Sequence, residues 1–251
     1  MLTHAELKYY SSLLQKKYRI EENKFLVEGH KLIQDALDSG LKCECLIASN
    51  LFSESHEDIV KQLSQRVERI EVAKQKDFEK LADTKTPQGI IGVFRKFVQH
   101  KSNKNVNRIV ALENISDPGN LGTILRNCDW FGFVKIILSD NCAEIYNPKV
   151  IRSSAGSVFH LDIIEEDDFN NSIQSYKNNG YKILCSDLNG ENIYEFSTPE
   201  KSIIVFCNEA NGPSNELLKM SDLQITIPKR GGAESLNVAS ASAVILSELS
   251  H

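Results

Sequence analysis

The residue types that could support a transfer reaction gather in three polar stretches, at residues 113–132, 203–214 and 227–249. Each stretch contains or follows the end of an apolar run that is typical of a buried strand. An arginine among apolar residues suits a phosphate group or a developing oxyanion. Amide, hydroxyl and carboxylate side chains can orient a polar ligand through hydrogen bonds. Together the three stretches predict a site for a small polar ligand.

The first stretch carries Arg126 on a predicted helix over residues 120–130. The buried face of this helix is predicted to consist of Leu121, Ile124, Leu125 and Cys128. An Asp-Pro-Gly-Asn turn with Asn120 as the cap is an ordinary way to begin a helix. That interpretation does not account for Arg126, which projects away from the apolar face in the second turn.

The second stretch begins with the apolar strand Ile203–Cys207, and Asn208, Glu209 and Gly212 follow it at once. Ligands of parallel sheets bind at the carboxyl ends of the strands, so these side chains are candidates for the site. The alternative is a plain turn between a strand and a helix, with Ser214 as the helix N-cap.

The third stretch reads as a strand, a glycine-bearing loop and a helix. The strand is predicted over Leu223–Ile227, and Pro228 ends it because proline has no N–H to donate. Ser235 is the predicted N-cap of a helix over residues 236–249, which is apolar nearly all round and therefore buried. A final core helix would explain the apolar residues, but not the polar cluster Glu234–Asn237 at its entrance.

Several familiar active-site patterns are absent from the sequence. No G-x-G-x-x-G follows a strand, and no P-loop, H-E-x-x-H or zinc-type Cys/His spacing occurs. Ser235 does not lie in a G-x-S-x-G elbow, which disfavours a hydrolase triad. We therefore expect no catalytic metal.

The composition is that of a globular protein with one large or two modest domains. Of the 251 residues, 41% are hydrophobic and 25% charged. No apolar run approaches the roughly 20 residues that span a bilayer, and the first residues do not resemble a signal peptide. The six cysteines are scattered without a C-x-x-C pair, which favours a reduced, cytoplasmic chain with free thiols and no membrane association.

Charge is distributed unevenly along the chain. Residues 1–107 contain 18 Lys and Arg against 15 Asp and Glu, whereas residues 108–251 contain 11 against 19. The overall net charge of −5 argues against a nucleic-acid binder, but the mildly basic first part could carry such a surface. An ordinary solvated face is the alternative explanation.

The second half of the chain alternates strands with helices, which predicts an α/β fold with a mostly parallel sheet covered on both faces. Strands are predicted at residues 108–112, 134–138, 159–163, 182–186, 203–207 and 223–227, and helices at 120–130, 148–153, 169–178, 214–219 and 236–249.

The first half predicts a smaller α/β layer of about 95 residues. Helices are expected at residues 3–18, around 30–37, at 57–64 and at 75–82, and strands at 25–27, 43–48, 67–72 and within 86–94. The cations Lys16, Lys17 and Arg19 suit the C-terminal end of the first helix through its dipole, and contact with phosphates is the alternative. The polar residues 97–107 read as a linker, so we predict domains at residues 1–105 and 106–251.

The three stretches resemble, in order, the motifs of the SpoU/TrmH family of RNA 2′-O-ribose methyltransferases in the SPOUT superfamily. Asn114–Arg126 resembles the first motif, Asn208–Gly212 the second and Ile227–Val238 the third. Lys149–Gly156 resembles a further family stretch. The first half, including Phe25–Gly29, resembles the family's small RNA-recognition domain, which is like a ribosomal protein.

This resemblance implies methyl transfer from S-adenosylmethionine to a ribose 2′-hydroxyl of RNA. It also implies a C-terminal trefoil knot, a rare exception to unknotted topology, and a homodimer. The small residues of the last helix suit both close threading and close subunit contact. An extra N-terminal domain favours ribosomal RNA of the 23S type over tRNA.

The resemblance also assigns roles to individual residues. The catalytic cluster that it implies is Arg126, Asn120, Glu209, Ser235 and Asn237. The cofactor-binding set that it implies is Cys207, Asn208, Gly212, Ile227 and Leu236. Arginine is effectively always protonated, so stabilising a forming alkoxide or holding a phosphate suits Arg126 better than acting as a base.

Two positions depart from the family's Gly-Asn-Glu-Gly pattern in the second motif, because Cys207 and Ala210 stand where the glycines would be. An alanine at a positive φ would be strained by about 1 kcal/mol. A catalytically weak or inactive RNA-binding protein is therefore one alternative prediction. A tRNA 2′-O-methyltransferase is another.

Overall fold

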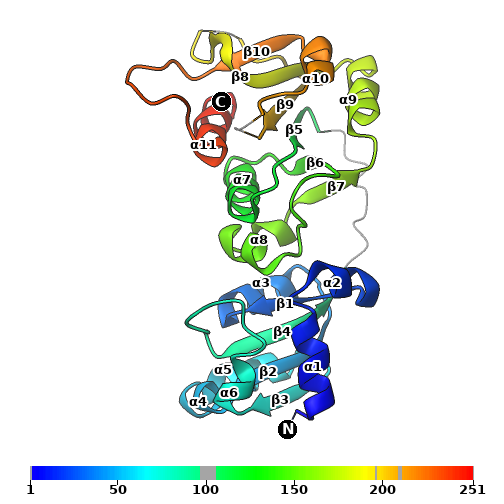
Figure 1. Cartoon of the computed structure of the whole chain (residues 1–251), viewed down its shortest axis with the longest axis vertical. Coiled ribbons are helices and arrows are strands. Elements are labelled where there is room, and N and C mark those ends of the chain that lie inside the picture. Colours follow the sequence, from blue (N-terminus) through cyan, green and yellow to red (C-terminus); the bar gives the residue numbers. More distant parts are fainter. Residues whose placement is uncertain (1, 97–105, 196, 209–210, 251) are drawn as a thin grey trace. The chain divides into compact units, whose positions relative to one another are not determined.

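The chain forms two compact units in a computed structural model that describes residues 2–96, 106–195, 197–208 and 211–250. The N-terminal unit comprises residues 1–98 and 144–159, and the C-terminal unit comprises residues 99–143 and 160–251. The chain therefore passes between the units three times, and a segment from the second half belongs to the first unit (Figure 1). Most of the predicted linker, residues 97–105, lies outside the described residues.

The N-terminal unit is built on a mixed sheet with strand order β1-β4-β2-β3. β4 pairs antiparallel with both β1 and β2, and β2 pairs parallel with β3. The elements of this unit are α1 (His4–Ser12), α2 (Lys16–Glu22), β1 (Lys24–Glu28), α3 (His30–Asp38), β2 (Cys43–Ser49), α4 (Asn50–Ser55), α5 (Glu57–Ser64), β3 (Ile70–Ala73), α6 (Gln75–Phe78), β4 (Ile90–Arg95), α8 (Pro148–Ser153) and the 3₁₀ helix Ser157–Phe159.

The single helix predicted over residues 3–18 is wrong, because the chain forms α1 and α2 with a break between them. Arg19 stabilises the break between the two helices. Its side chain is only 2% exposed, and its Nη1 donates to the carbonyl oxygens of Leu13 and Leu14 at 2.9 and 2.7 Å. The Arg19 guanidinium thus donates to carbonyl oxygens at the C-terminal end of α1, in agreement with the predicted helix-dipole role. The alternative, contact with phosphates, is excluded because the side chain is buried. Lys16 and Lys17 are exposed on α2.

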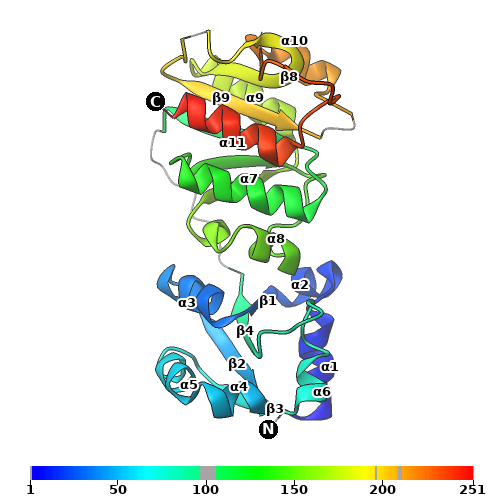
Figure 2. The same cartoon turned by 90° about the vertical axis from the view of Figure 1, so that its left-hand side faces the viewer.

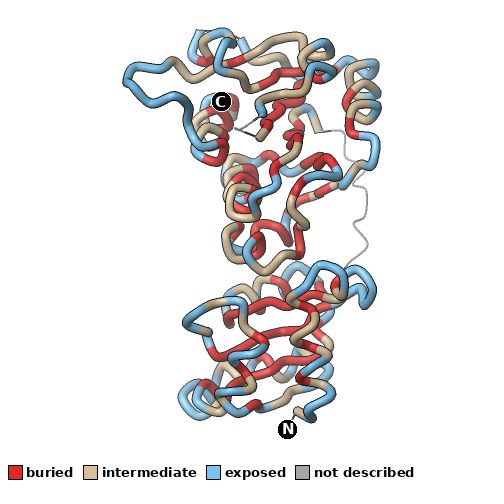
Figure 3. Tube along the Cα trace, in the orientation of Figure 1, coloured by how far each residue is buried: buried red, intermediate tan, exposed pale blue. Residues whose placement is uncertain are grey.

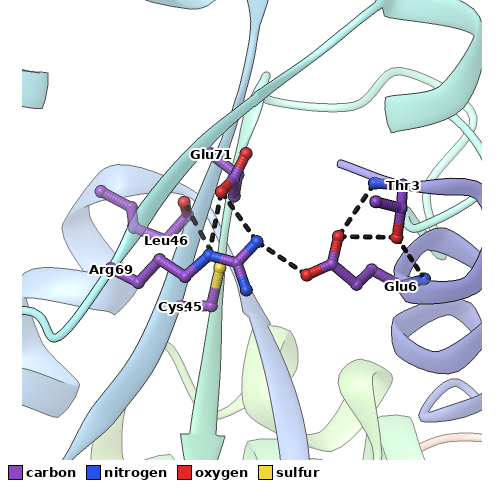
Figure 4. Close-up of polar contacts among 6 residues, drawn as sticks. All are labelled: Thr3, Glu6, Cys45, Leu46, Arg69 and Glu71. Atoms are coloured by element: carbon purple, nitrogen blue, oxygen red, sulfur yellow. Dashed lines mark hydrogen bonds and ion pairs between the residues drawn. The ribbon is translucent and has the colours of Figure 1, made fainter. Parts of the chain in front are cut away.

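The start of α1 is held by a capping box (Figure 4). Thr3 Oγ1 accepts from the backbone N–H of Glu6, while the carboxylate of Glu6 accepts from the backbone N–H of Thr3. Arg69 donates to both Glu6 and Glu71 at 2.7 Å and so connects α1 to β3. The hydrogen bond from the Thr3 backbone, and then the one from Arg69, lower the pKa of Glu6 to about 2.

We expect the stabilising effect of Glu6 to depend on pH. Because its folded pKa lies below the unfolded value of 4.5, the charged form favours the native state. The difference in Tm between the wild type and Glu6→Gln should be full above about pH 5 and should shrink as pH falls toward 2. Thermal unfolding at a series of pH values measures this difference. A difference that is constant with pH would contradict the role of the charge.

The C-terminal unit contains a fully parallel six-stranded sheet with order β10-β8-β9-β5-β6-β7, which confirms the predicted parallel sheet. Helices α7 and α11 lie side by side on one face, and α9 and α10 cover the other (Figures 1 and 2). The elements of this unit are β5 (Arg108–Glu113), α7 (Pro118–Trp130), β6 (Lys135–Ser139), β7 (Asp162–Glu166), α9 (Phe169–Asn178), β8 (Lys182–Asn192), β9 (Ser202–Cys207), α10 (Asn215–Met220), β10 (Leu223–Thr226) and α11 (Val238–Leu249).

Two predicted helix caps in this unit are wrong. The helix α7 begins at Pro118 rather than at Asn120, and its cap is Asp117, whose carboxylate accepts from the Asn120 N–H at 2.8 Å. The helix α11 is capped by Asn237 rather than by Ser235. No helix within the described residues is long and apolar enough to cross a membrane.

Candidate active site

A cavity of about 650 Å³ lies in the C-terminal unit, where β9 and β10 end. This volume falls in the range of roughly 300–1,000 Å³ that is usual for small-molecule sites. Its wall is formed by residues 186–189 in β8, by Cys207, Asn208 and residues 211–213 at the end of β9 and after it, by residues 226–231 and 233–236 at the end of β10 and after it, and by part of α11. The position agrees with the rule that ligands of parallel sheets bind at the carboxyl ends of the strands.

Part of this wall is an excursion within β8. The register between β8 and β10 jumps from Cys185↔Gln224 to Glu191↔Ile225, so the residues between lie out of the ladder. Gly190 permits the return, because a Cβ there would meet the backbone nitrogen of Ile225 at 2.5 Å. The strand is therefore longer than predicted, and its excursion adds wall residues that sequence periodicity did not indicate.

The wall contains all five residues to which the family resemblance gave a cofactor-binding role. These residues are Cys207, Asn208, Gly212, Ile227 and Leu236. Leu236 is 49% exposed, which leaves its side chain available to a ligand. Their binding role remains a prediction.

The segment after β9 is held by Glu113, a buried carboxylate at the end of β5. Its Oε2 accepts from the Ser214 N–H at 3.0 Å, and its carbonyl oxygen accepts from the Asn208 N–H at 3.2 Å. The Gly212 N–H donates to the Asn208 carbonyl at 2.8 Å, and Gly212 has a φ of +64°. Glu113 was not among the predicted site residues, and its only signal in the sequence was a lone carboxylate at the end of an apolar strand.

Cys207 does not need the conformational freedom of the glycine that the family pattern has at this position. It lies in β9, pairs in register with Glu113, and has no positive φ. The hydrogen bond with Cys185, together with burial, raises the pKa of the Cys207 thiol, so it stays protonated at neutral pH. Glu209 and Ala210 lie outside the described residues, so the prediction of strain at Ala210 and the catalytic role of Glu209 remain predictions.

Asn120 and Asn237, from helices far apart in the sequence, meet beside the cavity wall. Asn237 Nδ2 donates to Asn120 Oδ1 at 3.0 Å, and Asn237 Oδ1 accepts from the Ala239 N–H at 3.0 Å. Asn127 strengthens the same pairing of α7 and α11, since its Nδ2 donates to the Ala239 carbonyl and to Ser242 Oγ. One amide therefore caps α11 and ties it to α7, the helix that lies beside it (Figure 2).

We expect Asn237→Ala to lower the free energy of unfolding by about 0.5–2 kcal/mol, because the α11 cap is lost. Asn237→Asp keeps the capping oxygen but cannot donate to Asn120, so it should retain most of the stability. Urea unfolding monitored by circular dichroism separates the two variants. Equal losses in both would indicate that the tie to Asn120, and not the cap, carries the effect.

The other two described catalytic candidates are exposed. Ser235 lines the cavity from the loop before α11. Arg126 is exposed on α7 and forms no hydrogen bond or ion pair with any residue that the structure describes. Because Arg126 is not among the residues of the cavity wall, the structure joins Asn120 to Asn237 but does not itself join Arg126 to them.

Two family descriptions match the chain. SpoU rRNA Methylase matches residues 107–247, and MRM3-like substrate binding domain matches residues 4–92. The chain is 30% identical over 248 residues to the 23S rRNA (guanosine(2553)-2′-O)-methyltransferase RlmP of Bacillus subtilis, covering 98% of this chain and 96% of the relative.

Solved structures give the same result. The crystal structure of an AdoMet-bound rRNA methyltransferase from Sinorhizobium meliloti is 29% identical, with a TM-score of 0.81 over 99% of this chain and 95% of that one. The AviRb methyltransferase of Streptomyces viridochromogenes, at 23% identity, shares the fold with a TM-score of 0.87 over 99% and 97% of the two chains. The chain therefore belongs to the SpoU rRNA methylase family.

Proposed function

We propose that this protein transfers a methyl group from S-adenosylmethionine to a ribose 2′-hydroxyl of ribosomal RNA. The observation that carries this proposal is the cavity at the ends of β9 and β10, whose wall holds residues of two family motifs. The relative from Bacillus subtilis, similar over almost its whole length, acts on 23S rRNA, which is therefore the substrate that we propose.

The residues of the cavity fit the cofactor. The wall offers an apolar side chain at Leu236, an amide at Asn208 and open space at Gly212, where nothing lies within 4 Å of a Cβ position. These residues, with Cys207 and Ile227, would hold S-adenosylmethionine. The bound cofactor supplies a methyl group already activated on a sulfonium, so the protein has chiefly to bind and orient.

Several side chains would act on the RNA. The permanent charge of Arg126 would stabilise the alkoxide that forms as the ribose hydroxyl loses its proton, or would hold the neighbouring phosphate. The tie between Asn120 and Asn237 would set the position of α7, which carries Arg126. Ser235 and Glu209 complete the cluster that we propose.

The larger arrangement is also part of this proposal. We propose a recognition domain over residues 1–105, a methyltransferase domain over residues 106–251, a trefoil knot at the C-terminal end, a homodimer and a cytoplasmic location. The match of residues 4–92 to a substrate-binding domain supports the proposed recognition domain. The apolar helix α11, with its alanines and serines, suits the close packing that a knot and a subunit interface require.

The proposal is tested by incubating the purified protein with S-adenosylmethionine labelled in its methyl group and with 23S rRNA, 16S rRNA or tRNA as acceptor. Nucleoside analysis then identifies the product. We expect labelled 2′-O-methylated nucleoside from 23S rRNA alone. Label on a base nitrogen would overturn the reaction, label in tRNA alone would overturn the substrate, and RNA binding without transfer would indicate a catalytically inactive relative.

A further inference from the structure

The C-terminal unit must accept RNA although its sequence is acidic. The residues of this unit, 99–143 and 160–251, include 11 Lys and Arg against 18 Asp and Glu. RNA is a polyanion, and proteins bind it largely by placing cations against its phosphates. Such cations should therefore be concentrated where the target ribose enters, because the rest of the unit repels the substrate.

Most described cations of this unit are already engaged. The engaged ones are Arg108 with the Leu249 carbonyl, Lys135 over the Tyr176 ring, Lys177 and Lys182 with Asp222, and Lys201 over the Tyr181 ring. Four others have no hydrogen-bond, ion-pair or ring partner in the described part of the unit. They are Arg126, Lys219, Lys229 and Arg230.

Two of these four, Lys229 and Arg230, line the cavity itself. They lie on the loop between β10 and α11, where every residue from 229 to 237 is exposed (Figure 3). Nothing lies within 4 Å of a Cβ position at Gly231 or Gly232, so the loop has room to adjust to a ligand.

The acidic residues that the structure describes in the wall do not neutralise this pair. Asp187 and Glu234 also line the cavity, but neither forms an ion pair with Lys229 or Arg230. The Asp187 carboxylate accepts from the Asn189 N–H at 2.8 Å instead. Both cations are thus available to an anion at the cavity mouth.

We infer that Lys229 and Arg230 form a phosphate-binding lip, which holds RNA backbone phosphates beside the target ribose. The inference rests on the proposed function and deepens it. Two exposed cations in sequence can contact phosphates of one strand and neutralise the charge that the acidic unit would otherwise repel. Contacts of this kind position the strand but do not read its sequence.

The lip has a clear signature in salt-dependent RNA binding. Filter binding of in vitro transcribed 23S rRNA to the full-length protein gives the slope of log K against log salt. Each lost phosphate contact reduces the magnitude of that slope by about 1. We expect the double variant Lys229→Gln/Arg230→Gln to lose about two units of slope and to bind RNA roughly tenfold more weakly near 0.15 M salt. The Kd of S-adenosylmethionine should not change, because both side chains are exposed and neither is among the five proposed cofactor residues.

Lys219→Gln is the matched control, because Lys219 is also exposed and has no partner among the described residues, but lies on α10, outside the cavity wall. This control should keep the wild-type slope of log K against log salt. All variants should keep the wild-type Tm and sedimentation behaviour. An unchanged slope in the double variant would overturn the lip. Weaker S-adenosylmethionine binding would assign the pair to the cofactor instead, and altered sedimentation would assign it to a subunit contact.

The test also separates this inference from the proposed function. Wild-type protein that methylates 23S rRNA while the double variant keeps its slope would overturn the lip alone. Wild-type protein that neither binds nor methylates RNA would overturn both.

Discussion

Replacing Arg126 with alanine is expected to lower kcat for methyl transfer about 10²–10³-fold, the usual loss when one preorganised group that stabilises developing charge is removed. The Kd of S-adenosylmethionine should stay the same, because Arg126 is not part of the cavity wall. Stability should also stay the same, since the side chain is exposed and has no partner among the described residues. Single-turnover transfer to 23S rRNA, together with cofactor titration and thermal unfolding, measures all three quantities.

Arg126→Lys distinguishes the two ways in which Arg126 could act. Lysine keeps the positive charge but not the planar fork that holds an oxyanion or phosphate through two hydrogen bonds. A partial recovery would indicate that charge alone contributes, and no recovery would indicate that the geometry is required. Normal activity of Arg126→Ala would remove Arg126 from the proposed mechanism. Lys219→Ala controls for loss of an exposed cation elsewhere in the unit.

Sequence periodicity predicted the order of the elements well where a segment packs on one face. The bounds predicted for α5, α8 and α9 agree with the structure, and so does the parallel character of the larger sheet. Periodicity failed to predict where a helix begins or ends when a single side chain determines that point. Ser235 and Asn237 are both favourable N-cap residues, so the local sequence does not distinguish them, and in the structure Asn237 caps α11 and also bonds to Asn120.

The break between helices α1 and α2 was also not predictable from local sequence. The apolar spacing of residues 3–18 suits one helix. In the structure, however, the buried Arg19 side chain donates hydrogen bonds to the carbonyl oxygens of Leu13 and Leu14. The buried guanidinium is paired with the carboxylate of Glu144, which lies 125 residues away in the sequence. No local sequence pattern can predict such a distant partner. The strand predicted at residues 159–163 is also wrong in its position, since β7 is Asp162–Glu166 and a 3₁₀ turn precedes it.

The location of the candidate site was predictable because the motif residues follow strands whose carboxyl ends meet at one edge of the parallel sheet. The five proposed cofactor residues line one cavity, as their positions after β9 and β10 require. Glu113 was not predictable as a residue that holds a loop, because its partner, the Ser214 N–H, is a backbone group without a sequence signature. The excursion in β8 is likewise set by tertiary packing against β10.

The segment Glu144–Phe159 shows what domain prediction from sequence could not supply. It lies within the residues that match the methylase family, yet by its contacts it belongs to the N-terminal unit. The Tyr146 ring packs on Phe25 of β1, with ring centroids 4.6 Å apart. The backbone of Gly156, at a φ of +93°, passes so close to Asp35 that a Cβ would clash with its carboxylate. Dividing the chain near residue 105 would therefore separate this segment from the β-sheet that it covers.

The strongest connection of this segment to the unit is the buried ion pair of Arg19 and Glu144. Their side chains are only 2% and 7% exposed, Arg19 Nε donates to the carboxylate at 2.8 Å, and Lys96 donates to its other oxygen at 3.0 Å. Removing one partner of such a pair leaves a charge buried without compensation. We therefore expect Glu144→Leu to lower the free energy of unfolding of the N-terminal unit by about 3–5 kcal/mol.

The double variant Arg19→Met/Glu144→Leu tests whether the stranded charge causes this loss. Because it leaves no stranded guanidinium, it should be more stable than the sum of the single changes predicts. Urea unfolding, with hydrogen exchange of the β1 amides, measures each variant. The exposed pair Arg66–Asp38, at 2.7 Å with side chains 36% and 57% exposed, is the matched control, and its loss should change stability by only about 0–1 kcal/mol. Strictly additive losses at Arg19 and Glu144 would mean that packing, and not charge, joins the segment to the unit.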